Sequence, residues 1–103
     1  MGDIEELIKK FQTKLCKPED ILIVRGNDSF YIFFLSKGTI EIYLNDPRYG
    51  RIEGEYFELN QGSIFGEIGV LLKTKRSAYA RAQDYSILEI MSSKNFDLIS
   101  KTN

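Results

Sequence analysis

The residues of this chain that could act together chemically lie between positions 63 and 82. Gly66 and Glu67 open a short helical run that ends at Leu72, and Arg76 follows it. The first N–H groups of a helix have no internal partner and suit an anion, which Gly66 lets approach because it has no Cβ. Arg76 adds a planar fork matched to phosphate oxygens, and Glu67 is placed to accept hydrogen bonds from sugar hydroxyls. Together they indicate a pocket for one phosphate joined to one ribose.

Composition excludes most catalytic and metal chemistry. The 103 residues contain no His, so catalytic imidazoles and His-ligated metals are absent. The single cysteine, Cys16, can neither close an internal disulfide nor hold a zinc ion alone. Lys and Arg number 14 against 15 Asp and Glu, without the basic excess of a nucleic-acid-binding domain. We therefore predict no enzyme activity, no cofactor and no metal.

The elements that must position this pocket are mainly strands. After Pro18, β-branched and aromatic runs alternate with turn signals, which is typical of a β-sandwich, jelly roll or barrel. The strand after Gly38 places Ile40, Ile42 and Leu44 inward. We expect a mainly β domain with short flanking helices, over residues 20–91. The expected strands cover residues 21–25, 30–36, 39–44, 52–59, 79–82 and 86–91, and the aromatic residues of the second (Phe30, Tyr31, Phe33, Phe34) are expected in the core.

Helices are predicted at both ends of a single domain spanning residues 1–103. Apolar residues recur on one face of residues 3–17, behind Asp3 as a possible cap, and Pro18 stops the pattern. At the other end, Ser92 or Ser93 caps a helix over residues 93–101. The longest apolar run, residues 30–35, is far shorter than the ~20 residues that span a membrane. We expect a cytoplasmic protein without a membrane partner.

The segment over residues 65–78 resembles the phosphate-binding cassette of the cyclic nucleotide-binding domain family. That family includes catabolite activators, kinase regulatory subunits and cyclic nucleotide-gated channels. The resemblance covers most of the chain. It rests on three short motifs, which are Phe65-Gly66-Glu67-Ile68, Leu71-Leu72 and Arg76-Ser77-Ala78. It implies an antiparallel β-roll, a jelly roll also described as a double-stranded β-helix.

The resemblance also implies roles for individual residues. It assigns Glu67 to the ribose 2′-hydroxyl and Arg76 to the oxygens of the cyclic phosphate. Backbone N–H groups around Gly66, with Ser77 and Ala78, would complete the phosphate cradle. The predicted ligand-binding residues are Gly66, Glu67, Ile68, Arg76, Ser77 and Ala78. The ligand would be cyclic AMP or cyclic GMP, and Ser77 instead of threonine favours cyclic AMP.

The chain departs from the family pattern at three places. It has Gly69 where the family usually has alanine and Lys75 where it usually has proline, and residues 26–29 form a shortened turn. The chain also stops at Asn103, without the long helix that closes over the base in relatives. We expect a fragment or a stand-alone sensor whose partner is a protein or a missing downstream segment. This chain alone is not expected to bind DNA.

Two alternatives remain open from the sequence. The first is a β-roll that binds no ligand and serves as a scaffold for protein contacts. The second is a cupin-like enzyme, which a chain without His is poorly equipped to be. Within the motif, Glu67 and Arg76 could simply pair with each other as surface charges. Tyr79 and Arg81 are expected on the opposite strand face from Arg76, contacting solvent or another segment.

Overall fold

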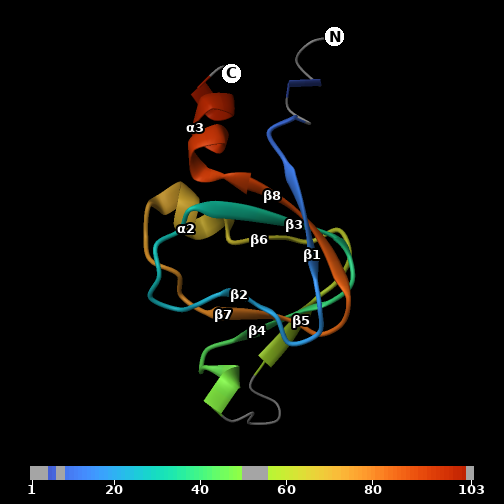
Figure 1. Ribbon diagram of the computed structural model, residues 1–103. Helices are drawn as coiled ribbons and strands as arrows, with labels where there is room; N and C mark the ends of the chain where they lie inside the picture. The colour runs from blue at the N-terminus through green and yellow to red at the C-terminus, as the bar shows by residue number, and fades with distance from the viewer. Residues whose placement is uncertain (1–4, 7–8, 50–55, 102–103) are drawn as a thin grey trace.

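Two four-stranded antiparallel sheets make up the domain in the computed structural model, which describes residues 5–6, 9–49 and 56–101. The first sheet has the order β1-β8-β3-β6, and the second has the order β2-β7-β4-β5. Figure 1 shows the two sheets facing each other, with the chain crossing between them several times. The strands are β1 (Gln12–Cys16), β2 (Ile21–Ile23), β3 (Tyr31–Lys37), β4 (Ile40–Tyr43), β5 (Tyr56–Leu59), β6 (Ile64–Phe65), β7 (Tyr79–Ala82) and β8 (Ser86–Ser92).

The core fills the space between the two sheets. Leu35 and Leu88 from the first sheet and Ile40 from the second are fully buried. Phe33 of β3 stacks on Phe65 of β6, with ring centroids 4.9 Å apart. The inward residues come from alternate strand positions, as expected for sheets with one buried face. The buried core cluster comprises Cys16, Ile23, Phe33, Leu35, Ile40, Phe65, Ala80, Ala82 and Leu88.

The predicted fold class is confirmed. The described residues form antiparallel sheets with a few short helices, and the chain alternates between the sheets as in a β-roll. Strands occur in each predicted range, although residues 52–55 of one of them lie outside the described part of the chain. The two-residue strand β6 was not predicted, because so short a segment carries no periodicity.

The predicted helix over residues 3–17 is wrong in its second half. Residues 12–16 form β1, which pairs with β8 from Gln12 opposite Ile90 to Cys16 opposite Ser86. Residues 5–6 and 9 are helical, and residues 3–4 and 7–8 lie outside the described residues. Leu15, taken as part of the apolar helix face, is 75% exposed, whereas Cys16 is buried and its burial raises the pKa of the thiol. Cross-strand pairing therefore outweighed an apparent helical period.

Two predictions about the core also need correction. Of the four aromatic residues assigned to it, only Phe33 is buried; Phe30, Tyr31 and Phe34 are exposed. Leu44 is likewise exposed, because β4 ends at Tyr43 and the alternation ends with it. The three aromatic residues were misassigned because an apolar run was interpreted as a strand buried on both faces.

Besides the helical residues 5–6 and 9, three helices flank the sheets in the described residues. The 3₁₀ helix η1 (Pro47–Tyr49) follows β4, α2 (Glu67–Leu72) follows β6, and α3 (Ser93–Lys101) continues directly from β8 (Figure 1). The start of α3 was predicted correctly, since the Oγ of Ser92 accepts a hydrogen bond from the Asn95 N–H at 3.1 Å. None of the helices in the described residues is long and apolar enough to cross a membrane.

Candidate functional site

A pocket of about 340 Å³ opens between the two sheets beside α2. Its volume lies within the range usual for small-molecule sites. One wall is apolar and comes from the strands: Ile23, Ile42, Phe57, Leu59, Ile64, Phe65, Tyr79 and Ala80. The other wall is formed by residues 66–69 at the start of α2 and residues 74–78 after it. The pocket thus has an apolar end and an end rich in backbone N–H groups and charge.

Gly66 makes the entry into α2 possible. It precedes the helix in the left-handed region, at φ 79°, where a residue with a Cβ is strained. A Cβ there would also lie 2.9 Å from Arg76 Nη1 and 3.0 Å from Phe33 Cδ2. The helix itself has only six residues, so its dipole is a minor source of attraction for an anion. The charge of the site rests mainly on Arg76.

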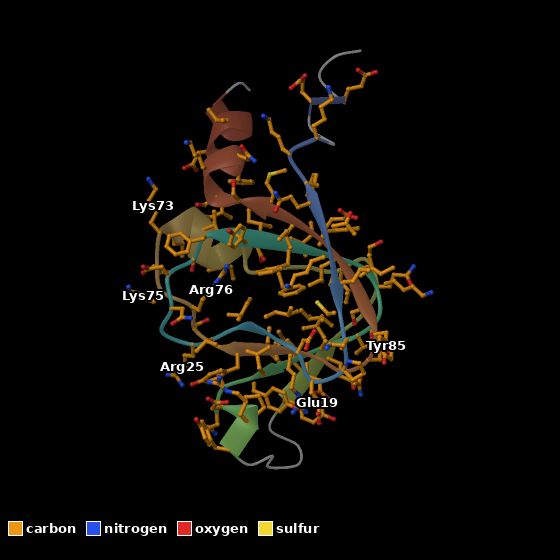
Figure 2. All side chains as sticks on the ribbon, in the orientation of Figure 1. Glu19, Arg25, Lys73, Lys75, Arg76 and Tyr85 are labelled. Carbon is orange, nitrogen blue, oxygen red and sulfur yellow. The ribbon has the colours of Figure 1, made fainter. Side chains whose placement is uncertain are left out.

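The Arg76 guanidinium joins the turn before α2 to strand β3. Its Nη1 donates to the Gly66 carbonyl and its Nη2 to the Tyr31 carbonyl, each at 2.6 Å. The side chain lies over the Phe33 ring, 5.8 Å from the centroid. Figure 2 shows it between the two sheets, whereas Lys73 and Lys75 extend outward. These two hydrogen bonds use two of the five guanidinium N–H donors.

Burial governs the electrostatics of this arginine. Arg76 is 8% exposed, and burial lowers its pKa, while the nearby Glu67 carboxylate acts in the opposite direction. A guanidinium nevertheless remains charged at any physiological pH. A partly desolvated cation of this kind interacts with an anion more strongly than a surface lysine does.

All six residues predicted to bind ligand line this one pocket. Gly66, Glu67 and Ile68 come from the start of α2, and Arg76, Ser77 and Ala78 come from the segment before β7. Sequence reasoning missed the apolar wall, although the alternating strand pattern already placed Ile42 inward. It also missed the Tyr31 carbonyl, because a backbone acceptor carries no signal in the sequence.

The structure decides two of the alternatives raised by the motif. Arg76 bonds to backbone carbonyls, and no ion pair joins it to Glu67 among the described residues. Of the two residues expected on the outer face of β7, Arg81 contacts another segment, as expected: it donates to Glu41 Oε1 at 2.9 Å and lies over the Tyr43 ring. Tyr79, expected on the same face, is among the residues that line the pocket. Within residues 5–6, 9–49 and 56–101, no group of three Cys, Asp or Glu side chains could hold a metal ion.

Substituting Gly66 by alanine tests the geometry of the site. We expect Gly66→Ala to lower the free energy of unfolding by about 1–3 kcal/mol from backbone strain, with a further loss from crowding against Arg76 and Phe33. Gly62→Ala is the matched control, because Gly62 also has a positive φ but has nothing within 4 Å of its Cβ position. Equal losses in urea denaturation would show that the crowding contributes nothing.

Comparison with known proteins agrees with this geometry. Residues 13–103 match the family described as the cyclic nucleotide-binding domain. A putative potassium channel protein of Rhodopseudomonas palustris is 31% identical over 81 residues, which are 79% of this chain and 19% of that protein. The chain thus spans about a fifth of this relative's length.

Solved structures have a similar overall fold. The cGMP-bound form of the EAL enzyme Bd1971 matches with a TM-score of 0.68 and 26% identity, covering 81% of this chain and 22% of that one. A cAMP-bound form of that enzyme matches equally well. The catabolite activator protein of Thermus thermophilus has a TM-score of 0.79 over 98% of this chain and 46% of its own, at 17% identity, which establishes the shared fold alone.

Proposed function

The chain belongs to the cyclic nucleotide-binding domain family, and from this premise we propose that it binds a cyclic nucleotide, with cyclic AMP preferred, as a regulatory sensor without catalysis of its own. The observation that carries the proposal is the convergence of Arg76, Glu67 and the turn at Gly66 on one pocket. One solved relative, the EAL enzyme Bd1971, is named in a cGMP-bound and a cAMP-bound form, which supports the ligand class. The preference for cyclic AMP rests on the resemblance of Ser77 to the cyclic AMP-binding activators.

In this proposal the phosphate is captured by Arg76 and by backbone N–H groups around it. Three guanidinium N–H donors remain for the phosphate while the other two hold the Gly66 and Tyr31 carbonyls. Glu67 accepts hydrogen bonds from the ribose 2′-hydroxyl. The base lies toward the apolar wall, where Phe57 is exposed at 61% and gains contact on binding.

The signal would pass from α2 to α3. Phosphate capture moves α2, and Leu71 of α2 lines the same groove as Phe96 of α3. The Phe30 carbonyl accepts from the Ser93 N–H at 2.6 Å, next to the Tyr31 carbonyl that Arg76 holds. A shift of α2 would therefore change how α3 packs near Phe96 and Leu98, biasing a protein partner or a further segment.

A second candidate function is a scaffold that binds no nucleotide. It is favoured by one observation: the guanidinium already donates to two carbonyls of its own chain. In that case Arg76 would serve to join α2 to β3, and α2 would have no role in sensing.

Titration calorimetry with cyclic AMP, cyclic GMP and 5′-AMP separates the two. We expect saturable binding of both cyclic nucleotides, stronger for cyclic AMP, and weak binding of 5′-AMP, whose dianionic monoester differs in charge and shape from a cyclic diester. No heat of binding from either cyclic nucleotide at millimolar concentration would contradict the sensor and leave the scaffold. Tighter binding of cyclic GMP would overturn only the preference.

A further inference from the structure

Residues 26–29, between β2 and β3, run along the segment that carries Arg76; we refer to them as the strap. The Gly26 N–H donates to the Arg76 carbonyl at 2.9 Å, and the Arg76 N–H donates to the Asn27 carbonyl at 2.8 Å. These reciprocal bonds hold the backbone of Arg76 from one side. They matter because residues 74–77 belong to neither a helix nor a strand, so their position depends on contacts of this kind.

The side chain of Ser29, the last residue of the strap, lies against Gly69 of α2. Its Oγ donates to the Thr74 carbonyl at 2.7 Å. It also occupies the space that a side chain at Gly69 would need, because a Cβ there would lie 2.1 Å from Ser29 Oγ and 2.8 Å from Ser29 Cβ. Gly69 in turn accepts from the Thr74 N–H at 2.9 Å. Ser29, Gly69 and Thr74 thus form one interlocked contact at the base of the Arg76 segment.

A surface ion pair extends the same contact. Lys75 Nζ and Asp28 Oδ1 pair across the strap, with both side chains more than half exposed. Such an exposed pair contributes little by itself. The contact at Gly69 differs from this ion pair: Gly69 is buried and has no side chain, and the half-buried Ser29 fills the space beside it. The position of Arg76 therefore depends on this contact more than on the ion pair.

We infer that Ser29 is a positioning residue for the Arg76 phosphate site and that Gly69 is its required complement. The inference rests on the proposed function. The Ser29 side chain occupies the space that a methyl group at position 69 would fill. Its hydroxyl adds a hydrogen bond to the Thr74 carbonyl that keeps residues 74–76 in place. An alanine at position 69 is then compatible with this chain only when the Ser29 side chain is removed.

Four variants measured with the wild type test the inference by calorimetry with cyclic AMP. We expect Ser29→Ala to weaken binding about three- to tenfold, as for one lost hydrogen bond, and Gly69→Ala to weaken it about tenfold or more. The double variant Ser29→Gly/Gly69→Ala is expected to bind more tightly than Gly69→Ala alone. Asp28→Ala, the matched control on the exposed part of the strap, is expected to change the affinity less than threefold.

Amide hydrogen exchange provides a readout that does not need the ligand. In Ser29→Ala we expect exchange at the Arg76 N–H to speed up about three- to tenfold, while exchange at the core amides of Leu35 and Leu88 stays unchanged. A merely structural role would raise exchange in the core as well, and that result, or an unchanged Arg76 amide, would overturn the inference. If the wild type binds neither cyclic nucleotide, the proposed function fails, and the exchange data still decide whether Ser29 positions Arg76.

Discussion

Arg76→Ala is expected to weaken binding of cyclic AMP by ten- to a hundredfold or more. The side chain is buried in the pocket and is the charged donor aimed at the position proposed for the phosphate. Charge-assisted hydrogen bonds contribute roughly 1.5–3 kcal/mol each, and about 1.4 kcal/mol corresponds to a tenfold change in affinity. Arg76→Lys is expected to recover only part of the loss, because an ammonium group cannot reproduce the fork that also holds Gly66 and Tyr31.

Arg25→Ala is the matched control for this loss. Arg25 is exposed, donates to the Leu44 carbonyl at 3.2 Å and does not line the pocket. In Figure 2 its side chain extends outward, away from the two sheets. Calorimetry on both variants, with circular dichroism to verify that each is folded, separates a local loss from a change in net charge. Similar affinities for Arg76→Ala and the wild type would contradict the proposed phosphate contact.

The largest effect on stability is expected from substitution of Glu41, on the outer face of the second sheet. Glu41 is 1% exposed and accepts from Arg81 Nε and Nη2 at 3.0 and 2.9 Å and from the Tyr43 hydroxyl at 2.7 Å. Removing one partner of a buried ion pair leaves the other charge without compensation, which costs about 3–5 kcal/mol. Glu41→Ala should lower the free energy of unfolding by that amount, a large share of the stability of a small domain.

Glu89→Ala is the matched control for Glu41→Ala. It removes the same side chain from a strand, but one whose bonds to the Thr13 hydroxyl lie at the surface, so we expect a loss below about 1 kcal/mol. The double variant Glu41→Ala/Arg81→Ala is expected to be more stable than Glu41→Ala, because the stranded charge is gone. Urea denaturation of the set measures these differences, and equal losses for the two single variants would show that burial of the pair is unimportant.

The pocket could be predicted from sequence because its key residues are close together in the chain. Gly66, Glu67 and Arg76 fall within one short segment, where residue type and spacing define a local geometry. Most strands were also predictable from β-branched and aromatic runs between turn residues. The helix at the C-terminal end had both a cap and an apolar face.

The errors arose where distant residues decide the structure. β1 is an edge strand with four of its five residues exposed, so its sequence does not reveal the pairing with β8, which joins Cys16 to Ser86 and Gln12 to Ile90. The contacts of Glu41 with Arg81 and of Ser29 with Thr74 join residues 40 and 45 positions apart. Such pairs cannot be found in a single sequence, because neither residue changes the local pattern around it.

The central claim, that a cyclic phosphate binds at the Arg76 guanidinium, is tested most directly by ¹⁵N NMR of the Arg76 side chain. With the resonance assigned by comparison with Arg76→Lys, titration with cyclic AMP is expected to shift the Nε–H signal progressively to saturation, while adenosine, which lacks the phosphate, leaves it in place. An Arg76 Nε–H signal that stays unchanged at a cyclic AMP concentration that saturates the protein by calorimetry would contradict the claim.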